Sequence, residues 1–461
     1  MPINRASKNS MSCLLPAICV VLVSCTTFVW RLSCCSAQPP LGNIVNASTP
    51  NPVGSGARAM GMGGAFIAVA DDATAASWNP AGLTQLKKPE ISFALSYFSR
   101  KDDITFGEHP EASGPETGLS KDINYLSMAY PFELLDRNMI VSLNYQLLYD
   151  FDRNIRTNIT TGFSNLNEQK VKFRQRGKLR TLSPAYAIEI TPDFSLGFTF
   201  NIWTDNLFWS NGWESNTIIN ASTYRKGLFN SRELSALTKE KDYDRFYGFS
   251  GFNMHIGFLW DINQFITIGG VVKTPFTGEM QHERVSITKN RGPQLPLSWY
   301  KIRIDEDVDM EMPLSYGLGV AVRFSDRFTT SLDVFRTEWD RFKMEDGFGR
   351  RWNPTTGKRS YESSTDETHQ VRLGAEYLFI FPRTVVPVRG GLFYDPEPTE
   401  NNPDDFWGAT LGTGISLGDL IFDCAYQFRY GNNVGGGLFK GYSSRSDVIQ
   451  HLLMVSFIYH F

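Results

Sequence analysis

Apolar side chains recur at every second position over most of this chain, and that period fits a β-strand and not a helix. In the segment 141–150 one face carries Val141, Leu143, Tyr145, Leu147 and Tyr149, and these alternate with Ser142, Asn144, Gln146, Leu148 and Asp150. The segment Leu314–Arg323 repeats the pattern. About fourteen strands are expected on this basis. They fall near residues 89–100, 121–132, 138–152, 170–190, 194–205, 246–260, 264–275, 313–324, 327–343, 367–380, 384–395, 404–417, 419–431 and 446–461.

Tight turns alternate strictly with longer connections between these segments. A bacterial transmembrane β-barrel has short turns at one end, long loops at the other and an even number of strands. Because open strand edges cannot exist in hydrocarbon, the last strand must close on the first. We therefore expect an all-β protein, a transmembrane antiparallel β-barrel. The short turns are expected at Asp136–Asn138, Thr191–Asp193, Asp261–Asn263, Ser325–Arg327, Phe381–Arg383 and Leu417–Asp419.

The composition agrees with a membrane barrel. Aromatic residues make up 13% of the 461 residues, and there are 39 glycines. The mean hydropathy is only −0.24, which suits strands in which alternate residues alone are apolar. The formal net charge of −3 gives no electrostatic argument for a nucleic-acid partner.

The last strand carries an aromatic C-terminus. Alternate residues from Ile449 to the terminal Phe461 share one apolar face, which includes Phe457 and Tyr459. A final aromatic residue on such a strand resembles the insertion signal that the outer-membrane barrel assembly machinery reads. The alternative is an ordinary aromatic edge strand.

The N-terminus contains the only long apolar run, Cys13–Trp30, which follows basic residues and precedes small ones. This order predicts a cleaved signal peptide at 1–37, although Cys25 leaves a lipoprotein leader open as an alternative. Cys424 is the one cysteine after the leader, so the mature chain cannot form an internal disulfide.

The segment Gly54–Leu83 is rich in glycine and alanine and contains an Asn-Pro break. Asp72 is placed to cap a short helix at Ala73–Trp78. That helix must end by Asn79, because Pro80 disfavours helical geometry in the residue before it. The glycines permit tight turns and close approach to a wall, so we expect a compact, movable segment.

This segment resembles the N-terminal signature of the outer-membrane long-chain fatty acid transporter family, of the FadL and TodX type. The resemblance implies a plug at 38–88 inside a barrel at 89–461, with the ligand site near the Asn-Pro break and a path that opens when the plug moves. A static plug that only stabilises the barrel is the alternative. The matching residues, taken as candidate plug and gating residues, are Arg58, Gly61, Gly63, Gly64, Phe66, Asp71, Asp72, Trp78, Asn79 and Pro80.

The inward positions of the predicted strands 246–260 and 446–461 indicate what kind of compound could pass through the barrel. A water-filled pore needs charged rings along its lumen, whereas these positions are mainly apolar with a few polar groups. Such a lumen suits an amphipathic ligand, for instance a fatty acid, although the same side chains could simply pack against the plug. The predicted ligand contacts are Phe249, Asn253, His255, Leu452 and Met454.

Other chemistry finds little support in the sequence. The six histidines are scattered without metal-ligand spacing and no G-x-S-x-G motif occurs, so we expect no metal, no cofactor and no enzyme. Ser250 and His255 are five apart and fall on opposite faces of one strand. The glycines from Gly61 to Gly64 fail as a dinucleotide fingerprint, because Phe66 stands where glycine or alanine is required.

Connection 206–245 carries the aromatic run Leu207–Trp209, which is either a landing surface for a hydrophobic ligand or part of a membrane-interface girdle. Three functions remain open. The first is a monomeric bacterial outer-membrane channel, embedded in outer-membrane lipid, for passive uptake of long-chain fatty acids or other hydrophobic compounds. The second is a docking component of a protein secretion system, because PorV-type relatives share the signature. The third is a structural barrel without transport.

Overall fold

The computed structural model describes residues 54–461 except 163–164, 206, 227–230, 294–295 and 436–442. The predicted signal peptide at 1–37 and the first part of the predicted plug, 38–53, lie outside the described residues.

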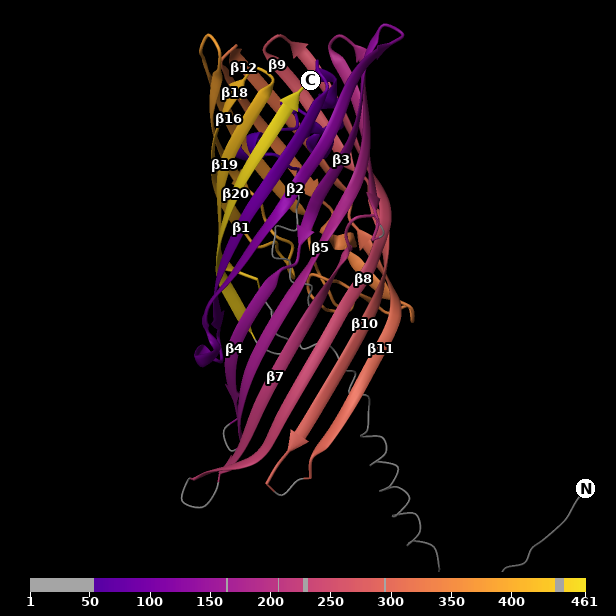
Figure 1. The fold of residues 1–461 in the computed structure, drawn as a ribbon. Helices are drawn as coiled ribbons and strands as arrows, with labels where there is room; N and C mark the ends of the chain where they lie inside the picture. Colours follow the sequence, from indigo (N-terminus) through magenta and orange to yellow (C-terminus); the bar gives the residue numbers. More distant parts are fainter. Residues whose placement is uncertain (1–53, 163–164, 206, 227–230, 294–295, 436–442) are drawn as a thin grey trace, which may run out of the picture. The chain divides into compact units, whose positions relative to one another are not determined.

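Fourteen strands of the described chain form a closed antiparallel barrel (Figure 1). The last strand pairs with the first, from Glu90 opposite His460 to Phe106 opposite Ser444, so the wall has no open edge. The predicted fold is therefore confirmed. The barrel strands are β1 (Glu90–Phe106), β2 (Gly114–Leu134), β3 (Arg137–Asp150), β5 (Asn165–Thr191), β6 (Phe194–Trp203), β8 (Arg232–Asn263), β9 (Ile266–Lys273), β12 (Ser315–Ser325), β13 (Phe328–Thr337), β16 (Thr368–Ile380), β17 (Val385–Tyr394), β18 (Phe406–Leu417), β19 (Leu420–Val434) and β20 (Ser444–His460).

Some local predictions were wrong. Arg137 and Asn138, predicted in a turn, already belong to β3, and the reversal before them lies at 135–136. Asp261–Asn263 still belongs to β8, and the reversal follows at 264–265, where the Asn263 side chain accepts hydrogen bonds from the backbone N–H groups of Phe265 (2.8 Å) and Ile266 (3.0 Å). The alternation in β3 also breaks, because the register shifts between Leu147 and Tyr149. This β-bulge turns Tyr149 toward the interior instead of the outer face.

The outward face of the wall is apolar, as a lipid-facing surface requires. Exposed hydrophobic side chains follow the even or odd positions of every barrel strand, and on β20 they include the three residues of the predicted insertion signal. The backbone N–H of Phe461 donates to the Pro89 carbonyl (3.0 Å), so the terminal residue helps to join the last strand to the first. Other outward side chains are Leu126, Met128, Val141, Leu143, Phe252, Leu318, Leu332, Leu373, Leu392, Leu411, Phe422 and Leu453.

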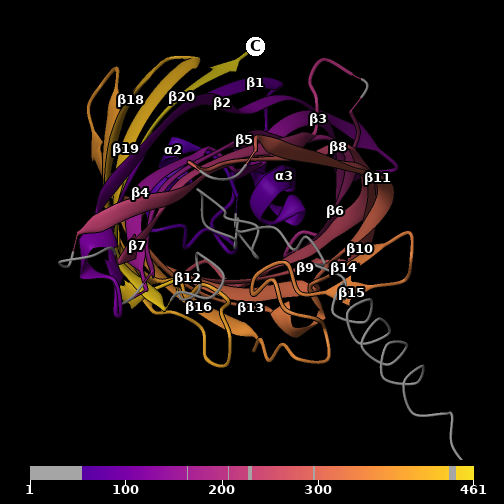
Figure 2. The same cartoon turned by 90° about the horizontal axis from the view of Figure 1, so that it is seen from below.

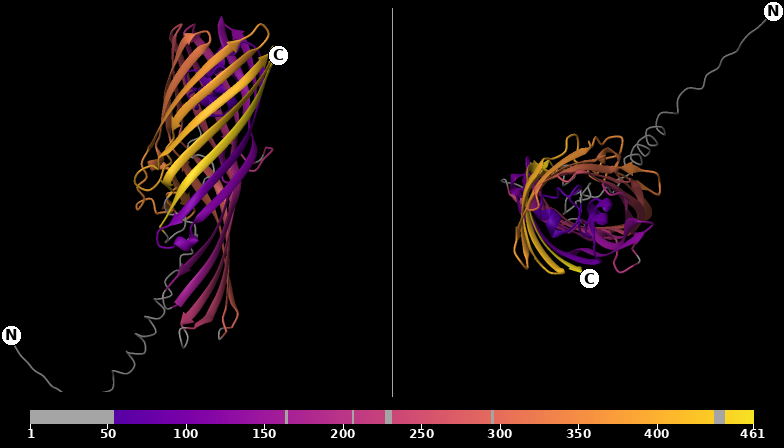
Figure 3. Two further views of the ribbon diagram at one scale, coloured as in Figure 1. Left: turned by 90° about the vertical axis from the view of Figure 1, so that its left-hand side faces the viewer. Right: turned by 90° about the horizontal axis from the view of Figure 1, so that it is seen from above.

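The sheet continues beyond the barrel on one side (Figures 1 and 3). Strands β5 and β8 run through, whereas their neighbours are interrupted and resume, for example at 151–152 between β3 and β4 and at 204–211 between β6 and β7. The predicted strands leave long connections at 206–245 and 276–312. Much of both connections is in fact strand. The additional strands are β4 (Arg153–Thr161), β7 (Gly212–Lys226), β10 (Phe276–Arg291), β11 (Ser298–Met312), β14 (Lys343–Asp346) and β15 (Arg351–Trp352), and a short 3-10 helix η4 (Trp339–Arg341) precedes β14.

Residues 54–86, here called the plug segment, lie inside the ring of strands (Figure 2). They form α2 (Ala57–Gly61), α3 (Ala75–Trp78) and the 3-10 helix η1 (Pro80–Gln85). Helix α3 ends at Trp78 as predicted but begins two residues later than predicted, with Thr74 and not Asp72 as its N-cap residue. Asp72 instead accepts hydrogen bonds from the backbone and hydroxyl of Thr74. No helix in the described part of the chain is long and apolar enough to cross a bilayer.

Candidate functional site

The plug segment is held by hydrogen bonds from its backbone to wall side chains. The carboxylate of Asp333 on β13, which is fully buried, accepts from the N–H groups of Phe66 (2.6 Å) and Ile67 (2.8 Å). On β18 the Thr410 hydroxyl accepts from Gly63 N–H (2.9 Å) and donates to the Gly61 carbonyl (2.9 Å). The wall therefore satisfies backbone groups that the short helices of the plug leave unpaired.

Glycines of the wall let the plug backbone approach closely. A Cβ at Gly257 on β8 would lie 2.0 Å from Asn79 Oδ1, and one at Gly391 on β17 would lie 2.3 Å from the Gly63 nitrogen. Gly63 itself has φ +69°, a conformation that favours glycine. The plug segment therefore makes close contact with the wall at both β8 and β17.

Arg58 connects the plug to a row of charges on the wall. Its guanidinium pairs with Asp71 of the plug and with Glu376 on β16 (3.0 Å). Glu376 also pairs with Arg389 on β17 (2.5 Å), and Arg389 pairs with Asp423 on β19 (2.5 Å). Each charge in this row faces an opposite charge, which is how buried ions are tolerated.

The remaining plug candidates fix the shape of the segment. The Trp78 indole donates to the Ser55 carbonyl (2.7 Å) and meets the Phe66 ring edge-on at 5.9 Å. The Asn79 amide donates to the carbonyls of Ile67 and of Phe258 on β8, both at 2.8 Å. Pro80 begins η1, where its missing N–H costs nothing.

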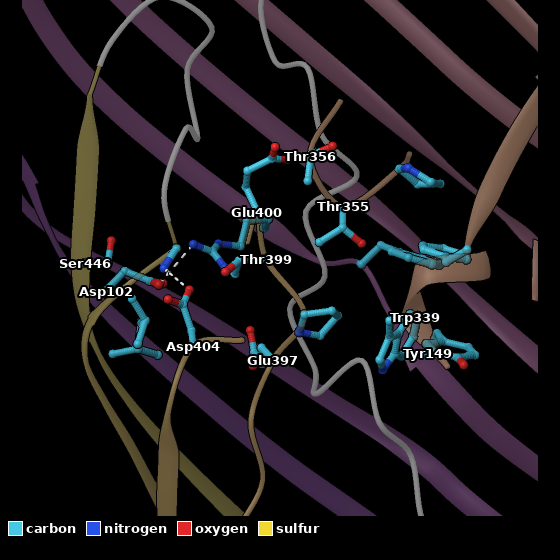
Figure 4. Close-up of a pocket in the computed structure, with 18 of the residues that line it drawn as sticks. Asp102, Tyr149, Trp339, Thr355, Thr356, Glu397, Thr399, Glu400, Asp404 and Ser446 are labelled. Carbon is cyan, nitrogen blue, oxygen red and sulfur yellow. Dashed lines mark hydrogen bonds and ion pairs between the residues drawn. The ribbon is translucent and has the colours of Figure 1, made fainter. Parts of the chain in front are cut away.

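The main cavity lies beyond the plug, at the level where the barrel passes into the extension, and has a volume of about 360 Å³. One side is apolar, and Figure 4 shows Trp339 and Tyr149 there, across the cavity from Asp102, Glu397 and Asp404. The aromatic groups pack on one another, as with Phe151 and Trp213 at 4.8 Å. The apolar wall consists of Tyr149, Phe151, Leu179, Trp213, Met310, Met312, Trp339 and Phe342.

The opposite side of this main cavity is charged. Asp102 pairs with both Arg100 and Arg153, each at 3.0 Å. Asp404, in the connection between β17 and β18, accepts from the Gly435 N–H at 2.5 Å. Burial raises the pKa of Asp404 to about 6, against the opposing effect of that hydrogen bond. A cavity with one apolar and one charged side fits an amphipathic molecule.

A second cavity of about 160 Å³ lies between the plug segment and the wall. Its lining includes Met60 and Trp78 of the plug and the predicted contacts Leu452 and Met454 on β20. It also reaches the facing sides of β2 and β3, whose pairing stops at Tyr125 opposite Gln146.

Beyond that pair, residues 117–124 of β2 face residues 147–150 of β3 without pairing to them, and we call this unpaired stretch the window. Side chains fill it: Lys178 on β5 pairs with Asp122 on β2 (2.5 Å). The far end is closed where Glu116 accepts from the backbone N–H of Arg156 (2.9 Å).

A third, smaller recess of about 70 Å³ adjoins the main cavity, with Tyr149 and Met312 lining both. Two predicted contacts, Asn253 and His255, lie here. The Nδ1 of His255 is buried and finds no hydrogen-bond partner within the described residues. Lys273 is the one charged side chain among the described residues that line this recess.

The lumen carries more charged side chains than the inward positions of segments 246–260 and 446–461 predicted. Phe249 is buried in the aromatic cluster but lines none of the three cavities. Inward positions of β13, β16, β17 and β19 carry paired ions instead, including Arg372 with Asp395 (3.5 Å) and Arg429 with Glu397 (2.6 Å). These residues were missed, although their strands show the same two-residue period and the inward phase could have been followed through them. Of the residues that the structure describes, no group of three or more His, Cys, Asp or Glu is arranged to hold a metal ion.

Comparisons with known proteins agree with this architecture. A Pseudomonas aeruginosa FadL homologue has a TM-score of 0.57 with 15% identity, over 90% of this chain and 100% of that one. The Pseudomonas putida toluene transporter TodX has a TM-score of 0.55 with 13% identity, over 89% and 100%. The monoaromatic hydrocarbon channel CymD has a TM-score of 0.50 with 15% identity, over 89% and 98%. At these identities the likeness concerns the fold.

No curated protein matches the chain by sequence. The family model for outer membrane protein transport proteins (OMPP1/FadL/TodX), however, matches residues 39–406, which is most of the chain. The chain therefore belongs to the OMPP1/FadL/TodX family, whose members are bacterial outer-membrane channels for hydrophobic compounds and not enzymes.

Proposed function

We propose that this channel carries long-chain fatty acids or closely similar amphipathic carboxylates, by passive uptake. The solved relatives named above include a toluene transporter and a monoaromatic hydrocarbon channel, so uncharged aromatic compounds are the competing class of cargo. The two classes of cargo differ in charge, because only the fatty acids carry a negatively charged carboxylate that side chains of the lumen could bind.

The observation that carries this proposal is the third recess. Lys273 and His255 line it, no acidic side chain stands among its described lining residues, and it adjoins the apolar wall at Tyr149 and Met312. A carboxylate in the recess would lie beside the side chains of Lys273 and His255, while its hydrocarbon chain would lie against the aromatic and methionine side chains of the main cavity. An uncharged hydrocarbon would form neither an ion pair nor a hydrogen bond with Lys273.

The plug segment and the window supply the rest of the route in this proposal. Cargo in the main cavity is separated from the short-turn end by the plug segment, with the second cavity between them. Movement of the plug, or passage through the window between β2 and β3, would then release the cargo. The ligand's own concentration gradient is sufficient to drive either path.

The test is uptake by a deletion strain that expresses Lys273→Gln. A hydrogen bond to a charged group contributes about 1.5–3 kcal/mol, so half-saturation for labelled oleate should rise by roughly 10- to 100-fold. Uptake of toluene through the same variant should be unchanged, and Lys273→Arg should retain oleate uptake. Equal loss for both compounds, or no loss for either, would contradict the carboxylate assignment.

The docking alternative has a distinct signature in the same strain. Normal oleate uptake after deletion of the channel, together with exported proteins retained in the periplasm, would support a secretion role instead. Tyr361→Asp, at an exposed position that lines none of the three cavities, is the matched control for expression.

A further inference from the structure

The connection between β6 and β7 leaves the sheet and returns to it. Strand β6 pairs with β5 as far as Trp203 opposite Thr181, and β7 resumes the pairing at Gly212 opposite Lys178. The side chain of Asn211 fills the gap: it accepts from the backbone N–H of Arg180 (2.9 Å) and donates to the Arg180 carbonyl (2.7 Å). The described residues of this connection, 204–205 and 207–211, are therefore an anchored excursion and not a break in the wall.

This excursion folds over the outer face of the barrel. Arg180 points outward, because its neighbours Leu179 and Thr181 are buried inside, and its guanidinium donates to the Ser210 carbonyl (3.2 Å). The Trp209 ring meets Tyr145 of β3 edge-on, with centroids 4.9 Å apart. Tyr145 belongs to the outward phase of β3.

Two apolar side chains of the excursion project away from the protein. Phe208 is 90% exposed and Leu207 is 42% exposed. They stand beside the lipid-facing band of the wall, where Leu143 on β3 is 52% exposed and Phe252 on β8 is 51% exposed. In water a phenylalanine this exposed gains no free energy from its apolar surface, whereas burial of that surface in lipid is favourable.

The position of the excursion relates it to the window. Tyr145, on which Trp209 packs, stands opposite Leu126 of β2, one pair before the pairing of β2 with β3 ends at Gln146. The aromatic run thus lies at the base of the window on the outer face.

We propose that Leu207 and Phe208 are inserted among the acyl chains of the outer leaflet, where they anchor the wall beside the window. Lipid is the occupant because these two side chains stand beside exposed apolar residues of the lipid-facing wall, and because the charged group at the edge of the patch, Arg180, is already engaged by Ser210. The proposal concerns the membrane contact alone and does not depend on which compound the channel carries.

The test places a fluorophore at the tip. In a full-length background with all six cysteines replaced by serine, Phe208→Cys is labelled with an environment-sensitive nitrobenzoxadiazole and reconstituted into phosphatidylcholine vesicles, with or without lipids that carry a nitroxide on the acyl chain. Leu143→Cys is the lipid-facing control. Phe348→Cys, which lies between β14 and β15 and is 78% exposed, is the control in water.

The expected result is blue-shifted emission and nitroxide quenching comparable to the Leu143 control and well above the Phe348 control. Leu207→Cys gives a second site if the first variant does not fold, as judged by heat modifiability. Water-like emission without quenching at the site that folds would overturn the proposal and favour a water-facing landing surface for ligand.

Discussion

Replacement of Asp333 by alanine is the most informative single perturbation of the plug. The buried carboxylate accepts two backbone hydrogen bonds, from Phe66 at 2.6 Å and Ile67 at 2.8 Å. Hydrogen bonds to a charged acceptor contribute about 1.5–3 kcal/mol each, so their loss should weaken seating of the plug by about 3–6 kcal/mol. Local opening of the plug should then become roughly 10²- to 10⁴-fold more frequent.

Amide hydrogen exchange measures this opening directly, because protection reports the free energy of local unfolding. Asp333→Ala should lose protection in the peptide that spans Phe66 and Ile67, while the wall strand β13 keeps its own. Asp333→Asn retains a carbonyl oxygen as an acceptor and should show an intermediate loss. A correctly folded Asp333→Ala protein with unchanged exchange across the plug would refute the argument that this carboxylate holds it.

Three further predictions concern the plug contact, the cavity and the C-terminus. Gly257→Val should displace the Asn-Pro break, because a Cβ at position 257 falls 2.0 Å from Asn79 Oδ1. The variant should therefore raise single-channel conductance in planar bilayers. Gly390→Val is the control and should leave the conductance unchanged, because the nearest atom there is 3.9 Å away. Binding of a permanently anionic alkyl sulfonate should strengthen as the pH falls through about 6, because Asp404, with its pKa raised to about 6, then loses its negative charge in the main cavity. Titration followed by tryptophan fluorescence should show no such pH step in Asp404→Asn. Deletion of Phe461, which bonds to the Pro89 carbonyl, should leave the protein in the periplasm without heat modifiability, and normal assembly would contradict its role as an insertion signal.

The barrel was predictable because the membrane imposes a simple rule on the sequence. Every spanning strand must present alternate apolar residues to lipid, so the segments near 314–323 and 446–461 could be recognised from period alone. The extension was not predictable in this way. Strands such as β7 and β10 face water on their outer side, so polar residues occupy positions that would be apolar within the membrane.

The site was predictable only in part. Arg58, Asn79 and Pro80 stood out because the plug signature is local in sequence. The wall partner of Arg58, Glu376, and the wall partner of Phe66, Asp333, lie more than 250 residues away and become neighbours only through closure of the barrel. The cavity depends on the bulge that turns Tyr149 inward, and a one-residue register shift leaves no clear mark in the sequence.

The central claim is that amphipathic cargo occupies the cavity between the extension and the plug. Photo-crosslinking with a diazirine-bearing fatty acid, followed by peptide mapping, tests it most directly in the intact channel. The account predicts adducts on the apolar wall, at Phe151, Trp213, Met310 or Trp339, which are suppressed by excess oleate. Adducts confined to lipid-facing residues such as Leu143 and Leu453, and insensitive to oleate, would contradict it.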